Sequence, residues 1–265
     1  MTDAAHLKSC CASLYESELA RALLGDSFHP SGPALTARLG TLLDLKPSER
    51  VLDIAAGNGA SAILIGQQFG CEVVGIDLGA EQVARAAARA ADAGVTGRVR
   101  FERGDAERLP AGSGSFDAVI CECAFCTFPD KNAAAREISR VLRPGGRFGM
   151  SDLTRSGPLP VELEGLLAWI ACIADARPVA EYTACLEAEG VRVASIENHD
   201  DALSAMVREI QGRLMATELL VKLQKMDLPD ADFEKARLLA RSAAEAVRTG
   251  LLGYSLITTR KPSCS

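Results

Sequence analysis

A short apolar run that ends in two closely spaced glycines determines what this 265-residue chain can fold into. Residues 51–56 are typical of a buried strand, Gly57 and Gly59 follow one residue apart, and residues 61–68 have the pattern of a helix. A glycine turn between a strand and a helix lets the backbone approach a ligand closely. The helix start then offers free N–H groups and a partial positive charge. The stretch therefore predicts a ligand-binding turn at the end of a strand.

Two carboxylates lie close to this turn. Asp53 comes four residues before Gly57, where a carboxylate suits a ligand with a cationic group. Asp77 ends the next apolar run, residues 71–76, and is placed to hold a pair of ribose hydroxyls. The glycine turn, together with Ala62, also satisfies the dinucleotide fingerprint, but Asp53 would repel a pyrophosphate there.

Apolar runs and helical patterns alternate along the first part of the chain. The expected strands are 51–55, 72–77, 98–102, 116–122 and 147–152, and the expected helices between them are 60–69, 80–93 and 130–142. Strands that alternate with helices predict a doubly wound α/β fold with a parallel sheet and helices on both faces. The chain length suits a single domain of this kind.

The flanking regions are mostly helical. Helices are expected at 4–24, 35–43, 161–174, 181–189, 201–225 and 230–249, and strands at 191–197 and 253–260. Asp200 or Asp201 is expected to cap the helix that follows strand 191–197. A helical pair between the last two strands, where a short turn would suffice, is interpreted as an insertion that covers a site.

Charge and hydropathy exclude several classes of partner. A net charge of -6 argues against nucleic acid, which requires a basic face. No window of roughly 18 apolar residues predicts a membrane span. The N-terminus has Asp3 and Lys8 and lacks an apolar signal region, so a cytoplasmic location is expected. The nine cysteines are then expected to be thiols.

Two further motifs identify a family. Gly104-Asp105-Ala106 follows the third strand, and the turn at residues 142–146 (LRPGG) precedes the fifth. With these motifs, residues 50–152 resemble the class I S-adenosylmethionine-dependent methyltransferases. The resemblance implies S-adenosyl-L-methionine as cofactor and a seven-stranded, mostly parallel sheet whose antiparallel last strand matches 253–260. It also implies one domain with an N-terminal helical lid (1–46), a cofactor-binding core (47–155) and substrate-side helices and last strands (156–265).

The same resemblance assigns roles to residues at matching positions. The methionine end of the cofactor would lie against Asp53 and the turn, the ribose against Asp77, and the adenine against the loop at 104–106. Glu122 ends the fourth strand and would point toward the cofactor sulfonium, or it could form a structural ion pair. The expected cofactor-binding residues are Asp53, Ala55, Gly57, Gly59, Asp77, Leu78, Asp105, Ala106 and Glu122.

Residues 116–175 resemble the arsenite methyltransferases more specifically. The shared features are Pro-Asp-Lys at 129–131, Ser-Asp at 151–152 and a cysteine, Cys172, on the following helix. The resemblance implies that Cys172 is an arsenic ligand. The chain departs from that subgroup at residues 60–63, which contain no cysteine, and between Cys185 and Cys264, where none occurs.

The cysteines suggest a site for a soft acceptor, because soft thiolates select thiophilic centres. Cys121 and Cys123 share one face if strand pairing persists that far, and Cys126 follows at the carboxyl edge of the sheet. The expected thiolate ligands for trivalent arsenic are Cys123, Cys126 and Cys172, with Cys10 and Cys11 on the N-terminal helix as further candidates. The alternatives are core packing, a zinc site, or a regulatory disulfide.

The sequence favours methyl transfer to a small acceptor, most simply arsenite, whose lone pair needs no general base. A small thiol or another small-molecule acceptor would gain more from a base such as His29, in the loop 25–33, or His199. His29 could equally serve only the turn. A nicotinamide-dependent oxidoreductase and a noncatalytic thiol-metal sensor are the remaining classes, and the oligomeric state is left open.

Overall fold

The computed structural model describes residues 29–163, 173–225, 228 and 232–263. Seven strands form one sheet in the order β3-β2-β1-β4-β5-β7-β6. The strands are β1 (Arg50–Ile54), β2 (Glu72–Asp77), β3 (Val99–Arg103), β4 (Phe116–Glu122), β5 (Leu142–Arg155), β6 (Arg192–Asn198) and β7 (Leu252–Arg260). Neighbouring strands from β3 to β5 pair in parallel, whereas β7 pairs antiparallel with both β5 and β6. The expected mostly parallel sheet with an antiparallel last strand is confirmed.

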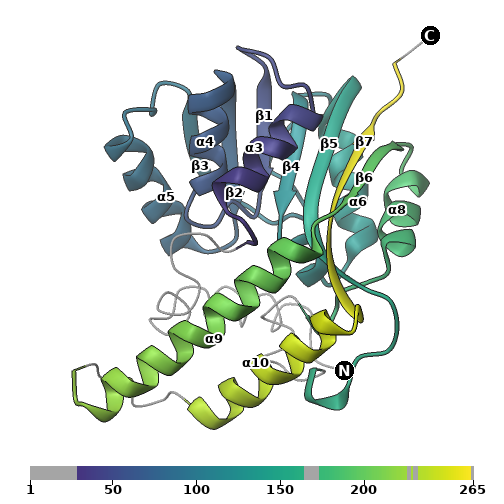
Figure 1. The fold of residues 1–265 in the computed structure, drawn as a ribbon. Helices are drawn as coiled ribbons and strands as arrows, with labels where there is room; N and C mark the ends of the chain where they lie inside the picture. The colour runs from purple at the N-terminus through teal and green to yellow at the C-terminus, as the bar shows by residue number, and fades with distance from the viewer. Residues whose placement is uncertain (1–28, 164–172, 226–227, 229–231, 264–265) are drawn as a thin grey trace.

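Helices cover the sheet and extend beyond one edge of it. They are α3 (Pro33–Leu42), α4 (Ala60–Phe69), α5 (Ala80–Asp92), α6 (Lys131–Val141), α8 (Val179–Ala188), α9 (Asp200–Lys222) and α10 (Phe233–Arg248). Helix α3 packs with α4, and α6 packs with α8. Figure 1 shows the α9–α10 pair lying beyond the sheet, at the edge where the parallel strands end. The expected helical insertion between the last two strands is therefore present.

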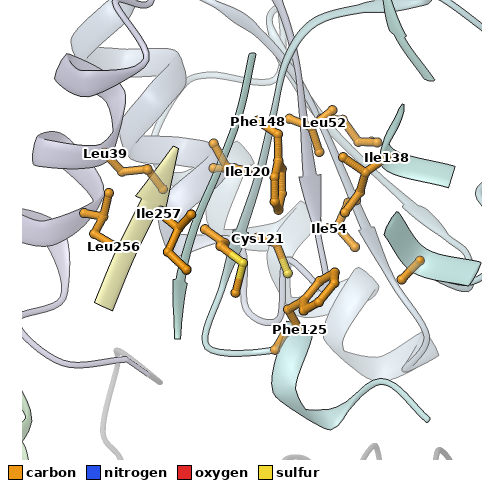
Figure 2. Packing of buried hydrophobic residues seen from close by; sticks show 14 of the residues in the cluster. Leu39, Leu52, Ile54, Ile120, Cys121, Phe125, Ile138, Phe148, Leu256 and Ile257 are labelled. Atoms are coloured by element: carbon orange, nitrogen blue, oxygen red, sulfur yellow. The ribbon is translucent and has the colours of Figure 1, made fainter. Parts of the chain in front are cut away.

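The core lies on both sides of the central strands. All residues of β4 are buried, as expected for a parallel strand covered on both faces. Figure 2 shows side chains from neighbouring strands packed together, among them Leu52, Ile120 and Phe148. This packing fixes the carboxyl ends of β1, β2 and β4 side by side, and those ends carry the candidate site.

The start of β5 differs from the prediction. The strand begins at Leu142, and the expected turn at 143–146 lies within it. The pairing with β4 shifts between Phe116↔Leu142 and Ala118↔Arg147. A bulge of this kind accommodates extra residues on one strand without ending the ladder.

The expected helix at 161–174 is corrected in its first part. Residues Val161–Leu163 form a 3-10 turn, in which the Leu163 amide donates to the Pro160 carbonyl oxygen at 2.8 Å. Such bonds, three residues apart, are typical of short 3-10 segments. Residues 164–172 lie outside the described residues, and Ile173 and Ala174 are not helical.

The start of α9 also corrects a prediction, because neither Asp200 nor Asp201 caps the helix. The cap position is His199, and Asp200 is the first helical residue. The Asp200 carboxylate instead accepts the Tyr254 backbone amide at 2.8 Å, which joins α9 to β7. A carboxylate in the first turn also interacts favourably with the helix dipole.

Within the residues that the structure describes, no helix combines the length and the apolar character needed to cross a bilayer.

Candidate active site

The glycine turn follows β1 and leads into α4. Ala55, Gly57 and Gly59 all have positive φ, at 58°, 53° and 80°. A Cβ atom on Gly59 would lie 2.6 Å from the Phe101 ring and 2.9 Å from Ala86. Glycine is therefore required at position 59 both by its backbone conformation and by the close packing around it.

Asp77 ties this turn to the end of β2. One carboxylate oxygen accepts the Gly57 amide and the other accepts the Gly79 amide, each at 2.8 Å. Burial raises the pKa of Asp77, and the backbone amides that bond to it oppose this shift. The Asp77 carboxylate thus fixes the position of the turn, and the carboxylate itself lies at the edge of the sheet.

Asp53 is a buried carboxylate with an unsatisfied oxygen. The Ala62 backbone amide bonds to the carboxylate, but Oδ2 is buried without a hydrogen-bond partner. Burial raises the pKa of Asp53 well above its usual range, and the charges of Glu122 and Asp77 raise it further. An unpaired buried oxygen is costly, so this position favours a ligand that brings a cation or a donor group.

Glu122, at the carboxyl end of β4, is surrounded by hydroxyl groups. Its Oε2 accepts from Thr36 Oγ1 at 2.7 Å and from Ser61 Oγ at 2.6 Å, and its Oε1 accepts from Ser151 Oγ at 3.2 Å. The Tyr254 hydroxyl donates in turn to Ser151 Oγ at 3.0 Å. Three elements, α3, α4 and β5, therefore meet at one carboxylate, and β7 reaches it through Ser151.

His29 lies against the same carboxylate. Its Nε2 atom is 3.7 Å from Glu122 Oε2 and 3.4 Å from Thr36 Oγ1, and its Nδ1 atom is 3.3 Å from the Pro30 carbonyl oxygen. The His29 side chain is only 9% exposed. The structure thus brings together an imidazole and a buried carboxylate at the edge of the sheet where the turn lies.

The charge of this region is negative. Among the described residues, no lysine or arginine forms an ion pair with Asp53, Asp77 or Glu122. Three carboxylates that no described lysine or arginine pairs with favour a cationic ligand and oppose a pyrophosphate.

The loop after β3 lies at the same edge of the sheet as the glycine turn. The Gly104 amide donates to the Asp77 carbonyl oxygen at 2.9 Å, which holds this loop beside the end of β2. Asp105 Oδ1 accepts the Glu107 amide at 2.9 Å and forms a turn, within which Ala106 is half-buried. Leu78, directly after Asp77, is half-buried as well. All the expected cofactor-binding residues therefore lie on the loops and strand ends of one edge.

The cysteines near β4 do not form one row. Cys121 is fully buried in the core, as Figure 2 shows, and burial raises the pKa of its thiol well above the usual range. The strand ends at Glu122, and Cys123 has a left-handed backbone, with φ 53°, so the alternation that would place Cys123 on the face of Cys121 is lost. Cys123 is half-buried. Cys126 is fully buried, and its amide donates to Asp152 Oδ2 at 2.9 Å.

The remaining cysteine candidates, Cys10, Cys11 and Cys172, lie outside the described residues, as do most of the expected lid and the helix around Cys172. The part of the chain that the structure describes contains no group of three or more His, Cys, Asp or Glu residues that could hold a metal ion.

His199 is placed differently from His29. Its Nε2 atom lies 3.3 Å from Glu197 Oε2. Arg38 on α3 donates to the same carboxylate, at 2.5 and 3.0 Å. His199 thus belongs to an ion-pair group that joins α3 to the end of β6, apart from the Glu122 hydroxyls.

No local sequence signal identifies the hydroxyl partners of Glu122, because Thr36, Ser61 and Ser151 are 86, 61 and 29 residues away along the chain. Lys131 is a second unpredicted feature. Its ammonium group donates to the carbonyl oxygens of Cys126 and Phe128, at 2.7 and 3.1 Å, and to Asp175 at 2.5 Å. It therefore holds the loop after β4 in place.

Replacing Lys131 with alanine is expected to lower the free energy of unfolding by about 2 kcal/mol, because two carbonyl oxygens lose their charged donor and the half-buried Asp175 carboxylate keeps only one of its two cations, Arg177. Lys235→Ala is the matched control, since it removes an exposed lysine–aspartate pair and should cost about 0–1 kcal/mol. Urea denaturation followed by circular dichroism measures both. Equal effects for the two variants would contradict the assigned role of Lys131.

A family model, curated relatives and solved structures that are similar to this chain all include methyltransferases. A family model described as a methyltransferase domain matches residues 51–146. The 27-O-demethylrifamycin SV methyltransferase of Amycolatopsis mediterranei is 33% identical over 239 residues, which cover 86% of this chain and 83% of that protein. An arsenite methyltransferase of Halobacterium salinarum is 30% identical over 161 residues, which cover 60% and 41%. A phosphoethanolamine N-methyltransferase of Haemonchus contortus in complex with S-adenosyl-L-methionine superimposes with a TM-score of 0.77 at 18% identity, covering 92% and 56%.

Proposed function

The chain belongs to the S-adenosylmethionine-dependent methyltransferases, and on this premise we propose that it transfers the methyl group to a hydroxyl oxygen of a small organic molecule. S-adenosyl-L-methionine is its methyl donor. When bound, this cofactor supplies a methyl group on a positively charged sulfur atom.

The residues at the edge of the sheet fit this donor. The unpaired Oδ2 of Asp53 suits the ammonium group of its methionine part. The two oxygens of Asp77 each accept one amide and retain capacity for a ribose hydroxyl. Asp105 and Ala106 would receive the adenine, beside Leu78. The positive φ angles of Ala55, Gly57 and Gly59 shape the turn against which the methionine part would lie.

One observation carries the choice of acceptor, and it is the contact between His29 and Glu122. A hydroxyl group must lose its proton as its oxygen gains a methyl group, whereas trivalent arsenic offers a lone pair and needs no base. An imidazole held beside a buried carboxylate is suited to accept that proton, because the carboxylate stabilises the imidazolium that forms.

The similarity to the rifamycin relative supports an oxygen acceptor. That similarity extends over 86% of the chain, so it includes elements outside residues 51–146, which the methyltransferase-domain model matches. The name of that relative describes a protein that methylates a small molecule at oxygen.

The proposal is tested by incubating the protein with donor that carries a deuterated methyl group and a panel of small phenols and alcohols. We expect mass spectrometry to detect a labelled O-methyl product. Labelled methylarsenic from arsenite and glutathione, with no product from any hydroxyl compound, would contradict the proposal.

Arsenite is a second candidate, which the Halobacterium relative and the half-buried Cys123 at the same edge favour. Its ligands would be Cys123, Cys126 and Cys172, with Cys10 and Cys11 as further thiols. Methylarsenic formation that is lost in Cys123→Ser and kept in Cys185→Ser would support it. Turnover of arsenite that is unchanged in both Cys123→Ser and Cys172→Ser would exclude these thiols as its ligands, and the absence of any methylarsenic would exclude arsenite as the acceptor.

A further inference from the structure

We propose that the carboxylate of Glu122 makes the site distinguish the charged methyl donor from its neutral demethylated product, S-adenosylhomocysteine. The inference rests on the donor and on the placement of Glu122. It does not depend on the acceptor proposed above, because it concerns binding in the absence of any acceptor.

The position of Glu122 is the first observation. It is the last residue of β4, and β4 pairs directly with β1, where Asp53 lies opposite Ile120. The charge of Glu122 also acts on Asp53, whose pKa it raises. The two carboxylates are therefore within electrostatic reach of each other, at the edge that receives the methionine end of the donor.

The surroundings of Glu122 are the second observation. The carboxylate is held by three hydroxyl groups, those of Thr36, Ser61 and Ser151, which orient it without neutralising it. No lysine or arginine in the described part of the chain pairs with it, and His29 is its one ionisable basic neighbour there. A buried and oriented charge of this kind acts more strongly on a ligand charge than an exposed one does.

Glu122 and Asp53 are expected to affect the binding of the two ligands differently. Donor and product share the methionine ammonium group, so a carboxylate that binds this group favours both ligands alike. Only the donor carries the additional positive charge on sulfur. A carboxylate near that sulfur therefore favours the donor alone, and it lets the product leave once the charge has gone.

The test is isothermal titration of the donor and of S-adenosylhomocysteine into the protein and three variants at about pH 8. In Glu122→Gln we expect the preference for the donor over the product to fall about tenfold, which corresponds to about 1.4 kcal/mol. In Asp53→Asn we expect both affinities to fall by similar factors, so that the preference stays within about twofold.

Asp117→Asn is the matched control, because it removes a carboxylate from the opposite end of the same strand. The Asp117 side chain accepts the Arg50 amide at 2.7 Å, far from the hydroxyls around Glu122, so the preference should not change. Equal weakening of donor and product in Glu122→Gln would overturn the proposal, since a purely structural role predicts that result.

Two further measurements distinguish the proposed electrostatic role of Glu122 from a loss of folding in Glu122→Gln. Glu122→Asp retains the charge and should retain the preference even if it lowers stability. With the wild-type protein, a donor analogue with a protonated amine in place of the sulfonium should bind more tightly than S-adenosylhomocysteine. A preference lost in Glu122→Asp, or an amine analogue that binds no better than the neutral product, would count against the proposal.

Discussion

Replacing Asp53 with asparagine is expected to weaken donor binding by about 100-fold. The unpaired Oδ2 of Asp53 is buried, so a cation that reaches it replaces an unsatisfied contact with a charge-assisted hydrogen bond. Removing one partner of a buried charge pair costs about 2–5 kcal/mol, and 100-fold corresponds to about 2.7 kcal/mol. Isothermal titration measures the change, and an affinity within about threefold of wild type would contradict the assignment.

The raised pKa of Asp53 also predicts the direction in which stability and donor affinity change with pH. The pKa of Asp53 is raised in the folded protein, chiefly by burial, so between the unfolded and the folded pKa the folded protein holds a proton that the unfolded chain has released. Stability from this group is present below the unfolded pKa and is lost as pH rises through the folded pKa. A cationic donor favours the ionised carboxylate, so within that pH range binding should release a proton and tighten as pH rises. Titrations in two buffers of different ionisation enthalpy should show this proton release in the wild type and its loss in Asp53→Asn.

Replacing His29 with alanine is expected to lower kcat for a hydroxyl acceptor by about 100-fold or more, within the range usual for a lost general base. The donor affinity should change little, because the imidazole contacts Glu122 and Thr36 and is not assigned to the donor. Steady-state kinetics with a labelled methyl donor and a titration of the donor separate the two quantities.

His199→Ala is the matched control for His29, since His199 is paired with Glu197 and lies in a different group of residues. Its kcat should remain within about twofold of wild type. A His29→Ala variant that keeps the wild-type rate with a hydroxyl acceptor would show that the base lies elsewhere.

The fold could be predicted from local patterns because buried parallel strands are nearly continuous apolar runs, separated by helices and glycine turns. The predicted bounds of α4, β2 and β4 agree with the structure. Asp53 and Asp77 could be placed at the ligand edge because strand ends in such a sheet meet there. The bulge at 143–146 could not be predicted, because it depends on how β5 pairs with β4.

The surroundings of the site residues were harder to predict than their positions. Glu122 could be placed at the end of β4, but its hydroxyl partners come from distant segments that only tertiary packing brings together. The same reason applies to Cys126, whose burial depends on packing around β4 rather than on its own spacing. Local patterns thus identify the edge, whereas charge balance and burial at that edge require the three-dimensional structure.

A crystal structure of the protein with S-adenosylhomocysteine tests the assigned site most directly. We expect the ligand ammonium within hydrogen-bond distance of Asp53 Oδ2, the ribose hydroxyls on Asp77, and the sulfur atom on the side of Glu122. A ligand bound away from the turn at Gly57–Gly59, or one whose ammonium group does not reach Asp53, would contradict this assignment.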